Sequence, residues 1–522
     1  MSAWVYILKC ACGSYYTGCT TNLEQRIAQH KAGFFENSYT SKRLPIELLY
    51  SQEFADISQA IVCERKLKKW SHKKKEALIN GNFEMLHTLS ECMNNTHYKN
   101  NPPTSLGMTE KKELHPNISD FKYLCSECGT QYEITKDLML CPKCREENLE
   151  GKPLKGILKV KLPETLRNSK NENDPFDIHD YLPVEKEYFP NLPVGNTPLI
   201  HANNFKSEFG FENVYLKFDG ANPTGSYKDR ASFLVSAFAK KFGLQEIVLA
   251  STGNAASSMA GIAASAGQKA FIFMPSTAPK AKLVQCLQYG ATLISIQGDY
   301  DKAFDLSLKF SEQTGFLNRN TAYNPMTIEG KKTSSFELVS QLKNIDYVFL
   351  PAGDGVVLSG VIKGFLDLRF IGLIKNLPKI IAVQAEGSRF LFDAFHFNKW
   401  DLQYKSDTVA DSISVNVARN GYCSVADLKT VNGDVVLVSD DEILSAQKLL
   451  SQKTGLFCEP SSAASFAGLL KMKETISKDA TVVCLLTGLG LKDIDSAIKK
   501  VNFPKTFPPD LEIISEALKL NN

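Results

Sequence analysis

One lysine lies in a glycine-bounded turn whose residue types suit amine chemistry. Residues 222–230 read Asn-Pro-Thr-Gly-Ser-Tyr-Lys-Asp-Arg, which places Lys228 three residues after Gly225. Residues 251–255 then read Ser-Thr-Gly-Asn-Ala, and residues 486–490 read Leu-Thr-Gly-Leu-Gly. A lysine amine in such a turn can form a Schiff base with the cofactor pyridoxal phosphate (PLP). The three motifs in this order predict a PLP site at Lys228, against the alternative that Lys228 is a solvated surface lysine.

Two predicted helix starts would position this chemistry. The turn joins a predicted strand at residues 214–218 to a helix expected to start near Asp229, and the glycine permits the tight bend. Residues 251–255 also follow an apolar strand and open a helix, with Asn254 as a candidate partner of the cofactor's phenolic oxygen. Because a helix N-terminus favours anions, three residues there are candidates for binding a substrate carboxylate: Ser251, Thr252 and Gly253. The alternative is an ordinary N-capped helix.

A third turn suits a phosphate group. Residues 350–355 read Leu-Pro-Ala-Gly-Asp-Gly, after a buried strand and before a helix. Backbone amides in that place can form a nest for the cofactor phosphate. A tight turn without a ligand would use the same Gly-x-Gly spacing.

The region from residue 192 to about 503 alternates apolar runs with helical segments. Several runs are continuous in Val, Ile and Leu, as expected for parallel strands buried on both faces. We expect strands at residues 246–250, 270–274, 292–296, 347–350, 379–384 and 481–486. This pattern predicts an α/β fold with parallel sheets.

Four cysteines upstream have metal-ligand spacing. Cys125, Cys128, Cys141 and Cys144 form the pattern C-x2-C-x12-C-x2-C, which predicts a closed, structural tetrahedral zinc site. A polar stretch, residues 93–119, reads as a linker before this module, and a further polar connection runs from it to about residue 185.

The N-terminal segment, residues 1–92, combines tyrosines, cations and a carboxylate. We expect strands at residues 5–8, 14–16 and 46–54, a helix at 22–32 and one strongly basic helix at 58–79. Tyr6 and Tyr16 lie on adjacent strands, Arg26 and His30 share a helical face, and Glu64 opens the basic helix. A carboxylate for Mg²⁺, an arginine for phosphate and a tyrosine or histidine for the proton suit a phosphodiester site. The alternatives are strand core for the tyrosines and a solvated face for the other three residues.

Bulk properties narrow the class of protein. The chain has 522 residues and a net charge of +3, and residues 1–95 hold 12 Lys and Arg against 9 Asp and Glu. The remainder is balanced, so the whole is neither a basic nucleic-acid scaffold nor an acidic tail protein. We expect no membrane span, because no apolar run of about 18 residues occurs, and no signal peptide. The 13 cysteines suit a reducing cytoplasm better than a disulfide framework.

Residues 120–503 or so resemble the fold-type II PLP enzymes, and most closely threonine synthase and its near relatives. The matching segments are residues 194–199, 222–230, 251–255, 329–333, 459–464 and 486–493. The resemblance implies the cofactor bond at Lys228, a ring-oxygen contact at Asn254 and a hydroxyl partner for the pyridine nitrogen at Thr487. It places the cofactor phosphate at Gly353, Asp354, Gly355, Val356 and Val357.

The implied reaction converts O-phosphohomoserine and water into threonine and phosphate, with Lys228 shuttling protons. Lys331 and Lys332 are candidates for binding the substrate phosphate, against the alternative of a solvated helix start. The resemblance also implies a homodimer. Many threonine synthase-like proteins begin with a zinc ribbon of this kind.

Three departures from the family pattern leave the substrate open. Tyr227 stands where Phe is common, Ala231-Ser232 replace a Gly-rich start, and Asp354 is followed by two valines rather than a longer Gly/Asn run. An aspartate beside a phosphate is costly unless its side chain turns away to cap backbone amides. A serine or threonine dehydratase, a cysteate synthase-like enzyme or another β- or γ-replacement enzyme is therefore the alternative.

Residues 3–84 or so resemble the GIY-YIG endonuclease superfamily, with Val5 for the first glycine and Thr17 for the second isoleucine. The resemblance implies an active centre at Tyr6, Tyr16, Arg26, His30 and Glu64, with Mg²⁺ at Glu64, DNA as partner and Tyr39 as a third tyrosine. We predict a fusion of four parts: a GIY-YIG-like domain (1–92), a linker (93–119), a zinc ribbon (120–150) and a two-domain PLP enzyme of the tryptophan synthase β-like fold (185–510). A third hypothesis, a nucleic-acid-processing factor with a PLP-like scaffold, conflicts with an intact Lys228, Asn254 and Thr487.

Overall fold

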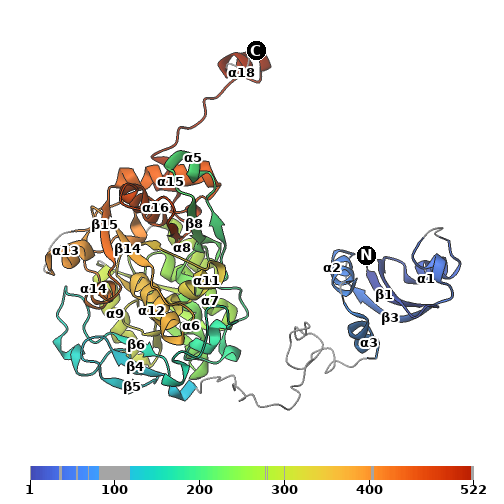
Figure 1. Cartoon of the computed structure of the whole chain (residues 1–522), viewed down its shortest axis with the longest axis horizontal. Helices are drawn as coiled ribbons and strands as arrows, with labels where there is room; N and C mark the ends of the chain where they lie inside the picture. Colours follow the sequence, from blue (N-terminus) through green and yellow to red (C-terminus); the bar gives the residue numbers. More distant parts are fainter. Residues whose placement is uncertain are drawn as a thin grey trace. The chain divides into compact units, whose positions relative to one another are not determined.

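The computed structural model describes residues 2–80 except 35–37, 55, 56 and 69, and residues 118–518 except 277, 279, 299 and 401–404. The chain divides into two compact units, Met1–Lys112 and Glu113–Asn522 (Figure 1). Residues 93–117 of the predicted linker lie outside the described residues, as do residues 81–92 of the predicted N-terminal domain.

The N-terminal unit is built on an antiparallel sheet in the order β2-β1-β3, formed by β1 (Ala3–Cys10), β2 (Tyr15–Thr20) and β3 (Ile46–Phe54). Alternate residues of β1 face opposite sides. Val5 and Ile7 pack with Ala60 and Leu67, while other β1 residues, Tyr6 and Leu8 among them, pack with Ile27 on the other side. The remaining elements are α1 (Leu23–Lys31), η1 (Ser41–Arg43), α2 (Ile57–Lys68) and α3 (His72–Ile79).

The single basic helix predicted over residues 58–79 is wrong, because two helices occupy that segment. α2 ends at Lys68 and α3 begins at His72. Ser71 has extended backbone angles, and its side chain accepts a hydrogen bond from the Lys74 N–H. A serine N-cap of this kind starts a new helix rather than continuing the previous one.

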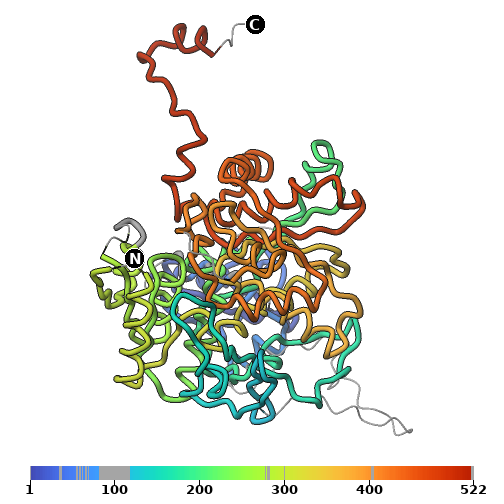
Figure 2. Tube along the Cα trace, turned by 90° about the vertical axis from the view of Figure 1, so that its left-hand side faces the viewer, coloured from blue at the N-terminus to red at the C-terminus, as the bar shows by residue number. Residues whose placement is uncertain are grey.

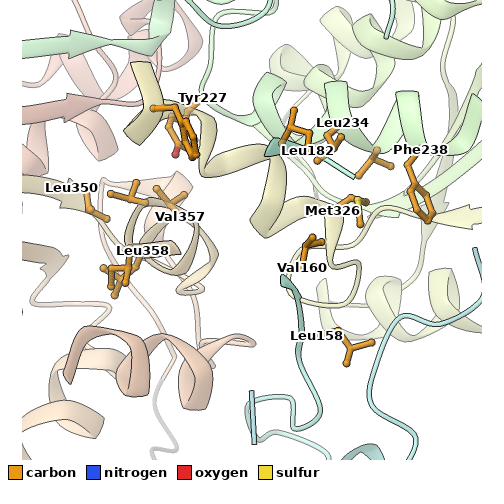
Figure 3. Close-up of a cluster of buried hydrophobic side chains, with 14 of the residues drawn as sticks. Leu158, Val160, Leu182, Tyr227, Leu234, Phe238, Met326, Leu350, Val357 and Leu358 are labelled. Atoms are coloured by element: carbon orange, nitrogen blue, oxygen red, sulfur yellow. The ribbon is translucent and has the colours of Figure 1, made fainter. Parts of the chain in front are cut away.

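The cysteine module is a small antiparallel sheet in the order β5-β4-β6. Its elements are η3 (Ile118–Asp120), β4 (Lys122–Cys125), β5 (Gln131–Glu133), η4 (Cys144–Glu147) and β6 (Leu158–Lys161). Leu158 and Val160 of β6 join the same buried cluster as Leu234, Phe238 and Met326 of the α/β body (Figure 3). The module and the α/β body therefore share one hydrophobic core.

The stretch after β6 is packed into the protein through apolar side chains, although its composition is polar. It forms short turns of helix, η5 (Glu164–Leu166), η6 (Ile178–Tyr181) and η7 (Lys186–Tyr188). Leu162, Leu166, Tyr181, Leu182 and Val184 are all buried. Widely spaced apolar residues thus anchor a segment that we expected to be a polar connection.

The larger sheet of the α/β body has the order β15-β14-β13-β16-β8-β7, parallel except for the β7–β8 pair. Its strands are β7 (Leu199–His201), β8 (Asn213–Phe218), β13 (Tyr347–Pro351), β14 (Lys379–Ala385), β15 (Asp434–Val438) and β16 (Thr481–Leu486). Along β13, Val348 and Leu350 belong to one core cluster and Phe349 to another. Both faces of the sheet are therefore buried, as the continuous apolar runs predicted.

The smaller sheet is parallel throughout, in the order β11-β10-β9-β12. Its strands are β9 (Glu246–Ala250), β10 (Lys269–Pro275), β11 (Thr292–Ile296) and β12 (Leu317–Asn318). The predicted α/β class with parallel sheets is confirmed, and β9, β11 and β16 have the predicted bounds.

Helices surround the two sheets, with α16 packed against the larger sheet and α9 against the smaller one. Before the catalytic region lies α5 (Phe205–Phe209), and η8 (Asp219–Ala221) follows β8. The others are α6 (Lys228–Lys241), α7 (Asn254–Ala266), α8 (Lys280–Gln288), α9 (Tyr300–Thr314), α10 (Met326–Lys331), α11 (Thr333–Gln341), α12 (Val356–Ile371), α13 (Phe390–Phe397), η9 (Asp411–Ile413), α14 (Gly421–Thr430), α15 (Asp440–Thr454), α16 (Pro460–Met472), η10 (Gly490–Lys492) and α17 (Ile494–Ile498). Beyond them the chain leaves the body and ends in α18 (Leu511–Ala517), at the top of Figure 2.

In the described parts of the chain, no helix combines the length and the apolar character needed to cross a bilayer.

The shared core predicts that a ribbon residue stabilises the whole second unit. Leu158→Ala should lower the free energy of unfolding by about 2–5 kcal/mol, because Leu158 is fully buried and its removal leaves a cavity. Leu149→Ala is the matched control, since Leu149 is 68% exposed. Thermal unfolding followed by circular dichroism would measure both, and equal melting temperatures for the two variants would contradict the shared core.

Candidate active site

Lys228 is the first residue of α6, at the end of a turn closed by side chains. Gly225 has a φ of +83°, which favours glycine. The buried Asp229 carboxylate accepts hydrogen bonds from Thr224, at 2.8 Å from its backbone N and 2.5 Å from its Oγ1. Burial raises the pKa of Asp229, although these hydrogen bonds act in the opposite direction. The turn thus fixes the base of the lysine side chain.

The downstream Thr-Gly-Leu motif is hydrogen-bonded to this same turn. The Tyr227 backbone N–H donates to the Thr487 carbonyl oxygen at 2.7 Å, and the Leu489 N–H donates to the Gly225 oxygen at 3.0 Å. Thr487 and Lys228 line one small cavity. Two motifs separated by about 260 residues in the sequence are therefore neighbours, as a shared PLP site requires.

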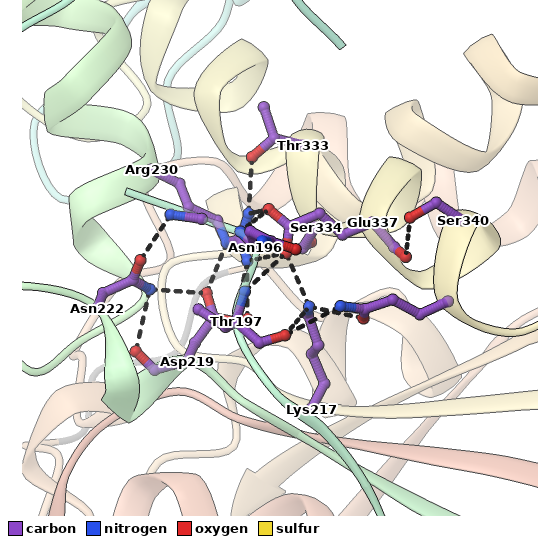
Figure 4. Close-up of polar contacts among 12 residues, drawn as sticks. Asn196, Thr197, Lys217, Asp219, Asn222, Arg230, Thr333, Ser334, Glu337 and Ser340 are labelled. Atoms are coloured by element: carbon purple, nitrogen blue, oxygen red, sulfur yellow. Dashed lines mark hydrogen bonds and ion pairs between the residues drawn. The ribbon is translucent and has the colours of Figure 1, made fainter. Parts of the chain in front are cut away.

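A buried ion network anchors α6 two residues beyond the lysine (Figure 4). The Arg230 guanidinium donates to Asp219 (Nε to Oδ2, 2.5 Å) and to Glu337 (Nη1 to Oε1, 2.6 Å). Lys217 Nζ also donates to Glu337, at 2.7 Å. Burial alone would raise the pKa of Glu337, but Arg230 and then Lys217 lower it to about 2. This network joins β8, η8, α6 and α11 around the start of the lysine helix.

Asn254 lies on the cavity wall and is held by residues that the sequence did not single out for a role. Its Nδ2 donates to the Glu459 carboxylate at 2.9 and 3.1 Å and to Ser412 Oγ at 3.1 Å. Asn254, Glu459 and Ser412 line the small cavity together with Lys228 and Thr487. Glu459 belongs to a segment that matched the family pattern, whereas Ser412 gave no signal at all.

The predicted phosphate loop follows β13 and precedes α12. Gly355 has a φ of +89°, and a Cβ there would lie 2.4 Å from Ser424 Oγ. Asp354 Oδ1 accepts a hydrogen bond from the Val356 N–H at 2.9 Å, so its side chain caps the backbone as expected. The Val356 amide is therefore already engaged, and the amides that follow at the start of α12 are left to face an anion.

The two adjacent lysines that we considered for the substrate phosphate have different environments. Lys332 is paired with Glu329 and with Asp367 (2.9 Å), and it donates to the Tyr181 carbonyl at 2.7 Å. Lys331 is also buried, but burial and then the nearby Lys228 hold its pKa well below the ordinary range, with only Asp354 raising it. Lys331 lies near enough to Lys228 and Asp354 to interact with both electrostatically, whereas Lys332 belongs to a core ion network.

The Ser-Thr-Gly loop borders a cavity of about 450 Å³ that Lys228 and Asn254 also line. Ser251, Thr252 and Gly253 all contribute to its wall. Ser251 Oγ accepts hydrogen bonds from the Gly253 and Ala256 amides, both at 3.2 Å. The loop is thus a capped helix start that also opens onto the site.

These residues fit PLP. Lys228 offers an amine on the cavity wall, Asn254 an amide and Thr487 a hydroxyl, and the start of α12 suits a phosphate.

The four cysteines of the ribbon converge on one point. Cys125 Sγ lies 3.8 Å from Cys144 Sγ, Cys128 Sγ lies 3.7 Å from Cys141 Sγ, and all four sulfurs lie within 4.8 Å of one another. A tetrahedron with Zn–S bonds of about 2.3 Å has edges of about 3.8 Å. The donor set and its spacing therefore fit a structural Zn²⁺ ion.

In the N-terminal unit, the first tyrosine and the histidine form a hydrogen-bond chain. Tyr6 Oη lies 2.9 Å from His30 Nε2, and His30 Nδ1 lies 2.8 Å from Thr40 Oγ1. Burial raises the pKa of Tyr6 to about 12 and lowers the pKa of His30, which favours the neutral forms of both the phenol and the imidazole. A Cβ at Gly18 would lie 2.6 Å from Tyr6 Oη, which explains a glycine there.

The other predicted nuclease residues lie around this chain. The Tyr16 ring is 5.2 Å from the His30 ring and 6.2 Å from the Tyr39 ring. Arg26 hydrogen-bonds to Tyr6. Glu64 is paired with Lys68 at 2.5 Å, and both lie close enough to Cys19 to shift its pKa. The structure thus brings Tyr6, Tyr16, Arg26 and His30 together, with Glu64 held by a lysine that sequence analysis did not connect to it.

The ion network around Arg230 predicts a specific loss of stability in acid. A carboxyl whose pKa is lowered by folding stabilises the fold above its unfolded pKa, and this contribution disappears as the pH falls through the folded value. For Glu337 that window runs from pH about 4.5 down to about 2, and the loss is on the order of 3 kcal/mol. Glu337→Gln should be less stable at neutral pH and should decline less steeply across this window.

Urea unfolding at a series of pH values would measure this difference, with Glu474→Gln as the control because that side chain is 80% exposed. Loss of metal from the cysteine cluster in acid would affect all three proteins alike. Parallel curves for Glu337→Gln and the unaltered protein would refute the assignment.

Two families of known proteins match separate parts of the chain. Residues 191–488 match the family described as pyridoxal-phosphate dependent enzyme, and residues 2–77 match the GIY-YIG catalytic domain. Threonine synthase of Methanocaldococcus jannaschii is 34% identical over 408 residues, which cover 76% of this chain and 98% of that protein. Threonine synthase of a Synechocystis species is 38% identical over 344 residues, which cover 65% and 88%.

Solved structures agree at the level of the fold. The processed form of threonine deaminase isoform 2 from Solanum lycopersicum superposes with a TM-score of 0.53 at 24% identity, covering 65% of this chain and 97% of that one. Maize serine racemase gives a TM-score of 0.50 at 22% identity, covering 62% and 92%. Through its family match and its relatives, this chain belongs to the PLP-dependent enzymes of the threonine synthase family, and it carries a GIY-YIG domain at its N-terminus.

Proposed function

We propose that the second unit is a threonine synthase, which converts O-phosphohomoserine and water into threonine and phosphate. The observation that carries this proposal is the environment of Lys228, an amine that lines a cavity of about 450 Å³ together with the buried cation Arg319. A phosphorylated amino acid is an anion that such a cavity would bind. The relatives named threonine synthase support the same substrate.

The residues of the cavity divide the work of this reaction. Lys228 would hold PLP, which supplies an electron sink when bound, and its free amine would move protons at Cα and Cβ of the substrate. Asn254 would orient the ring through its amide, and Thr487 would offer a neutral hydroxyl to the ring nitrogen. Ser251 and its neighbours would bind the substrate carboxylate, while phosphate leaves from Cγ and water adds at Cβ.

Lys331 is the lysine of the pair that we assign to the anion. Its charge is not neutralised by a hydrogen-bonded carboxylate among the described residues, in contrast to Lys332. Burial and the nearby Lys228 lower its pKa, and a bound phosphate would act in the opposite direction and favour the protonated amine. Lys332 would then act only in the core ion network with Asp367.

The lysine assignment predicts both a spectrum and an activity. The purified protein with PLP should show the long-wavelength absorbance band of a lysine-bound cofactor and should release phosphate from O-phosphohomoserine. Lys228→Ala should lose the band and reduce turnover by at least about 10³-fold. Lys240→Ala, an exposed lysine on the same helix, is the control and should change neither.

The result separates the alternatives. A band without phosphate release would keep the cofactor and move the substrate to that of a dehydratase or another replacement enzyme. A band that survives in Lys228→Ala would refute the lysine assignment.

A second candidate function, Mg²⁺-dependent cleavage of DNA, rests on the Tyr6–His30–Thr40 chain in the N-terminal unit. Such a chain lets a tyrosine and a histidine exchange a proton, and Arg26 is a cation suited to a phosphodiester. Glu64 is a single carboxylate, which Mg²⁺ often uses together with several waters. The ion would displace Lys68 from that carboxylate.

The nuclease proposal predicts nicking of branched or duplex DNA that depends on Mg²⁺ and on Glu64. Glu64→Ala should abolish cleavage because the metal ligand is lost, whereas Glu47→Ala should not, since Glu47 is exposed on β3. Gel electrophoresis of a labelled branched substrate would measure both. Equal cleavage by the two variants would exclude Glu64 as the ligand.

A further inference from the structure

Arg319 is a buried cation with no anionic hydrogen-bond partner in the part of the chain that the structure describes. It follows β12 and is only 1% exposed. Its Nε donates to Ser232 Oγ at 3.3 Å, whereas its Nη2 has no hydrogen-bond partner among the described residues. Burying a guanidinium without a paired anion is costly. A protein that keeps such a group buried gains from it elsewhere.

A second buried arginine in the same fold shows the contrast. Arg230 is 2% exposed, yet its guanidinium donates to Asp219 through Nε and Nη2 and to Glu337 through Nη1 and Nη2. Both carboxylates belong to the fold itself. Arg230 is therefore a structural arginine. Arg319 is equally buried, but no carboxylate among the described residues accepts a hydrogen bond from it.

Arg319 lies on the wall of the substrate side of the site. It lines the cavity of about 450 Å³ together with Lys228, Ser251 and Asn254. It does not line the smaller cavity, which is bordered by Gly353, Val357 and Thr487 among others. The guanidinium thus borders the cavity of the proposed carboxylate-binding loop, to whose wall the loop proposed for the cofactor phosphate contributes Asp354.

The two carboxylates that raise the pKa of Arg319 already accept hydrogen bonds from other groups. Lys228, Lys331 and Arg319 all interact electrostatically with Asp354, whose carboxylate also accepts the Val356 amide. Asp229 lies near Arg319 as well, but Thr224 holds its carboxylate. Burial lowers the pKa of Arg319 to about 10, which leaves it protonated at neutral pH. Lys228 and Arg319 line the cavity together with Asp354, and a bound phosphate would add negative charge that also favours a protonated Lys331.

We propose that Arg319 binds the phosphate group of the substrate and selects for a phosphorylated amino acid. The planar fork of a guanidinium can donate two parallel hydrogen bonds to one phosphate, and Lys331 would neutralise the remaining charge. This inference rests on the proposed function and adds a residue to its substrate site. The same chemistry could serve the cofactor phosphate, which the experiment distinguishes.

The test compares Arg319→Met with Arg389→Met, a partly exposed arginine paired with Asp393, in the full chain loaded with PLP. Inorganic phosphate is the binding probe. It should raise the melting temperature of the unaltered protein and of Arg389→Met, but not of Arg319→Met. Without phosphate, Arg319→Met should melt at the same temperature as the unaltered protein or higher, because an unpaired buried charge has been removed.

Kinetics and cofactor titration distinguish the two phosphate sources. Arg319→Met should raise the KM for O-phosphohomoserine about 10- to 100-fold, the range expected for losing hydrogen bonds to a charged group. Its affinity for PLP, from the absorbance titration, should not change, and Arg319→Lys should recover part of the phosphate effect. A fall in PLP affinity with an unchanged KM would assign Arg319 to the cofactor and overturn the proposal.

Two further outcomes would also overturn it. One is that Arg319→Met melts at a lower temperature than the unaltered protein without phosphate, while added phosphate raises its melting temperature as much as before. This result would mean that Arg319 only stabilises the fold. The other outcome applies if Arg319→Met does not fold. In that case the proposal is overturned if phosphate raises the melting temperature of Arg319→Lys as much as that of the unaltered protein and the KM of Arg319→Lys is unchanged. The melting shift needs no turnover, so it tests Arg319 even if the unaltered protein releases no phosphate from O-phosphohomoserine.

Discussion

The contact between Arg230 and the two carboxylates of Asp219 and Glu337 is the constraint on which the catalytic unit depends. It joins the end of β8, the start of α6 and the middle of α11 within one buried network. Lys228 begins the helix that Arg230 anchors, so the network fixes where the lysine side chain starts. Buried ion pairs of this kind are weak evidence for stability but lose much free energy when one partner is removed. The same property makes them suitable for fixing geometry.

Buried charges in this unit fall into two groups, and the division outlines the site. Arg230 and Lys332 have hydrogen-bonded carboxylates within the fold, whereas Arg319 and Lys331 have only the field of Asp354 in common. The unpaired group lies around Lys228. A cavity wall that holds a buried guanidinium such as Arg319 is already organised for an anion and needs little rearrangement on binding. The stability lost by that arrangement is balanced by the large shared core, to which the ribbon also contributes.

The N-terminal unit holds its polar residues in a small buried hydrogen-bond chain. Its sheet has the first tyrosine buried within β1, and Gly18 on the neighbouring strand leaves room for the phenol. His30 then joins two hydroxyl groups through its two ring nitrogens. A raised tyrosine pKa and a lowered histidine pKa both follow from burial, which favours the neutral form of each group. The buried tyrosine, histidine and threonine are thus joined by hydrogen bonds and could pass a proton along this chain.

Local chemistry was readable from the order of residues alone. The glycine before Lys228, the cysteine spacing, and the apolar runs at β9, β11 and β16 each depend on neighbours in the chain, and these predictions agree with the structure. Partners distant in the sequence were not readable. Nothing local distinguishes Lys331 from Lys332, or identifies Ser412 as a partner of Asn254.

The reason is physical, since a side chain's pKa, hydrogen bonds and burial are set by whatever the fold places beside it. The break at Ser71 and the anchored segment after β6 were missed for a related reason, because one capping hydrogen bond or a few spaced apolar residues leave little periodic signal. The sequence thus specifies the chemical groups and the local turns that hold them. Only the tertiary structure decides which of the buried charges are neutralised, because the anions that neutralise them come from distant parts of the chain.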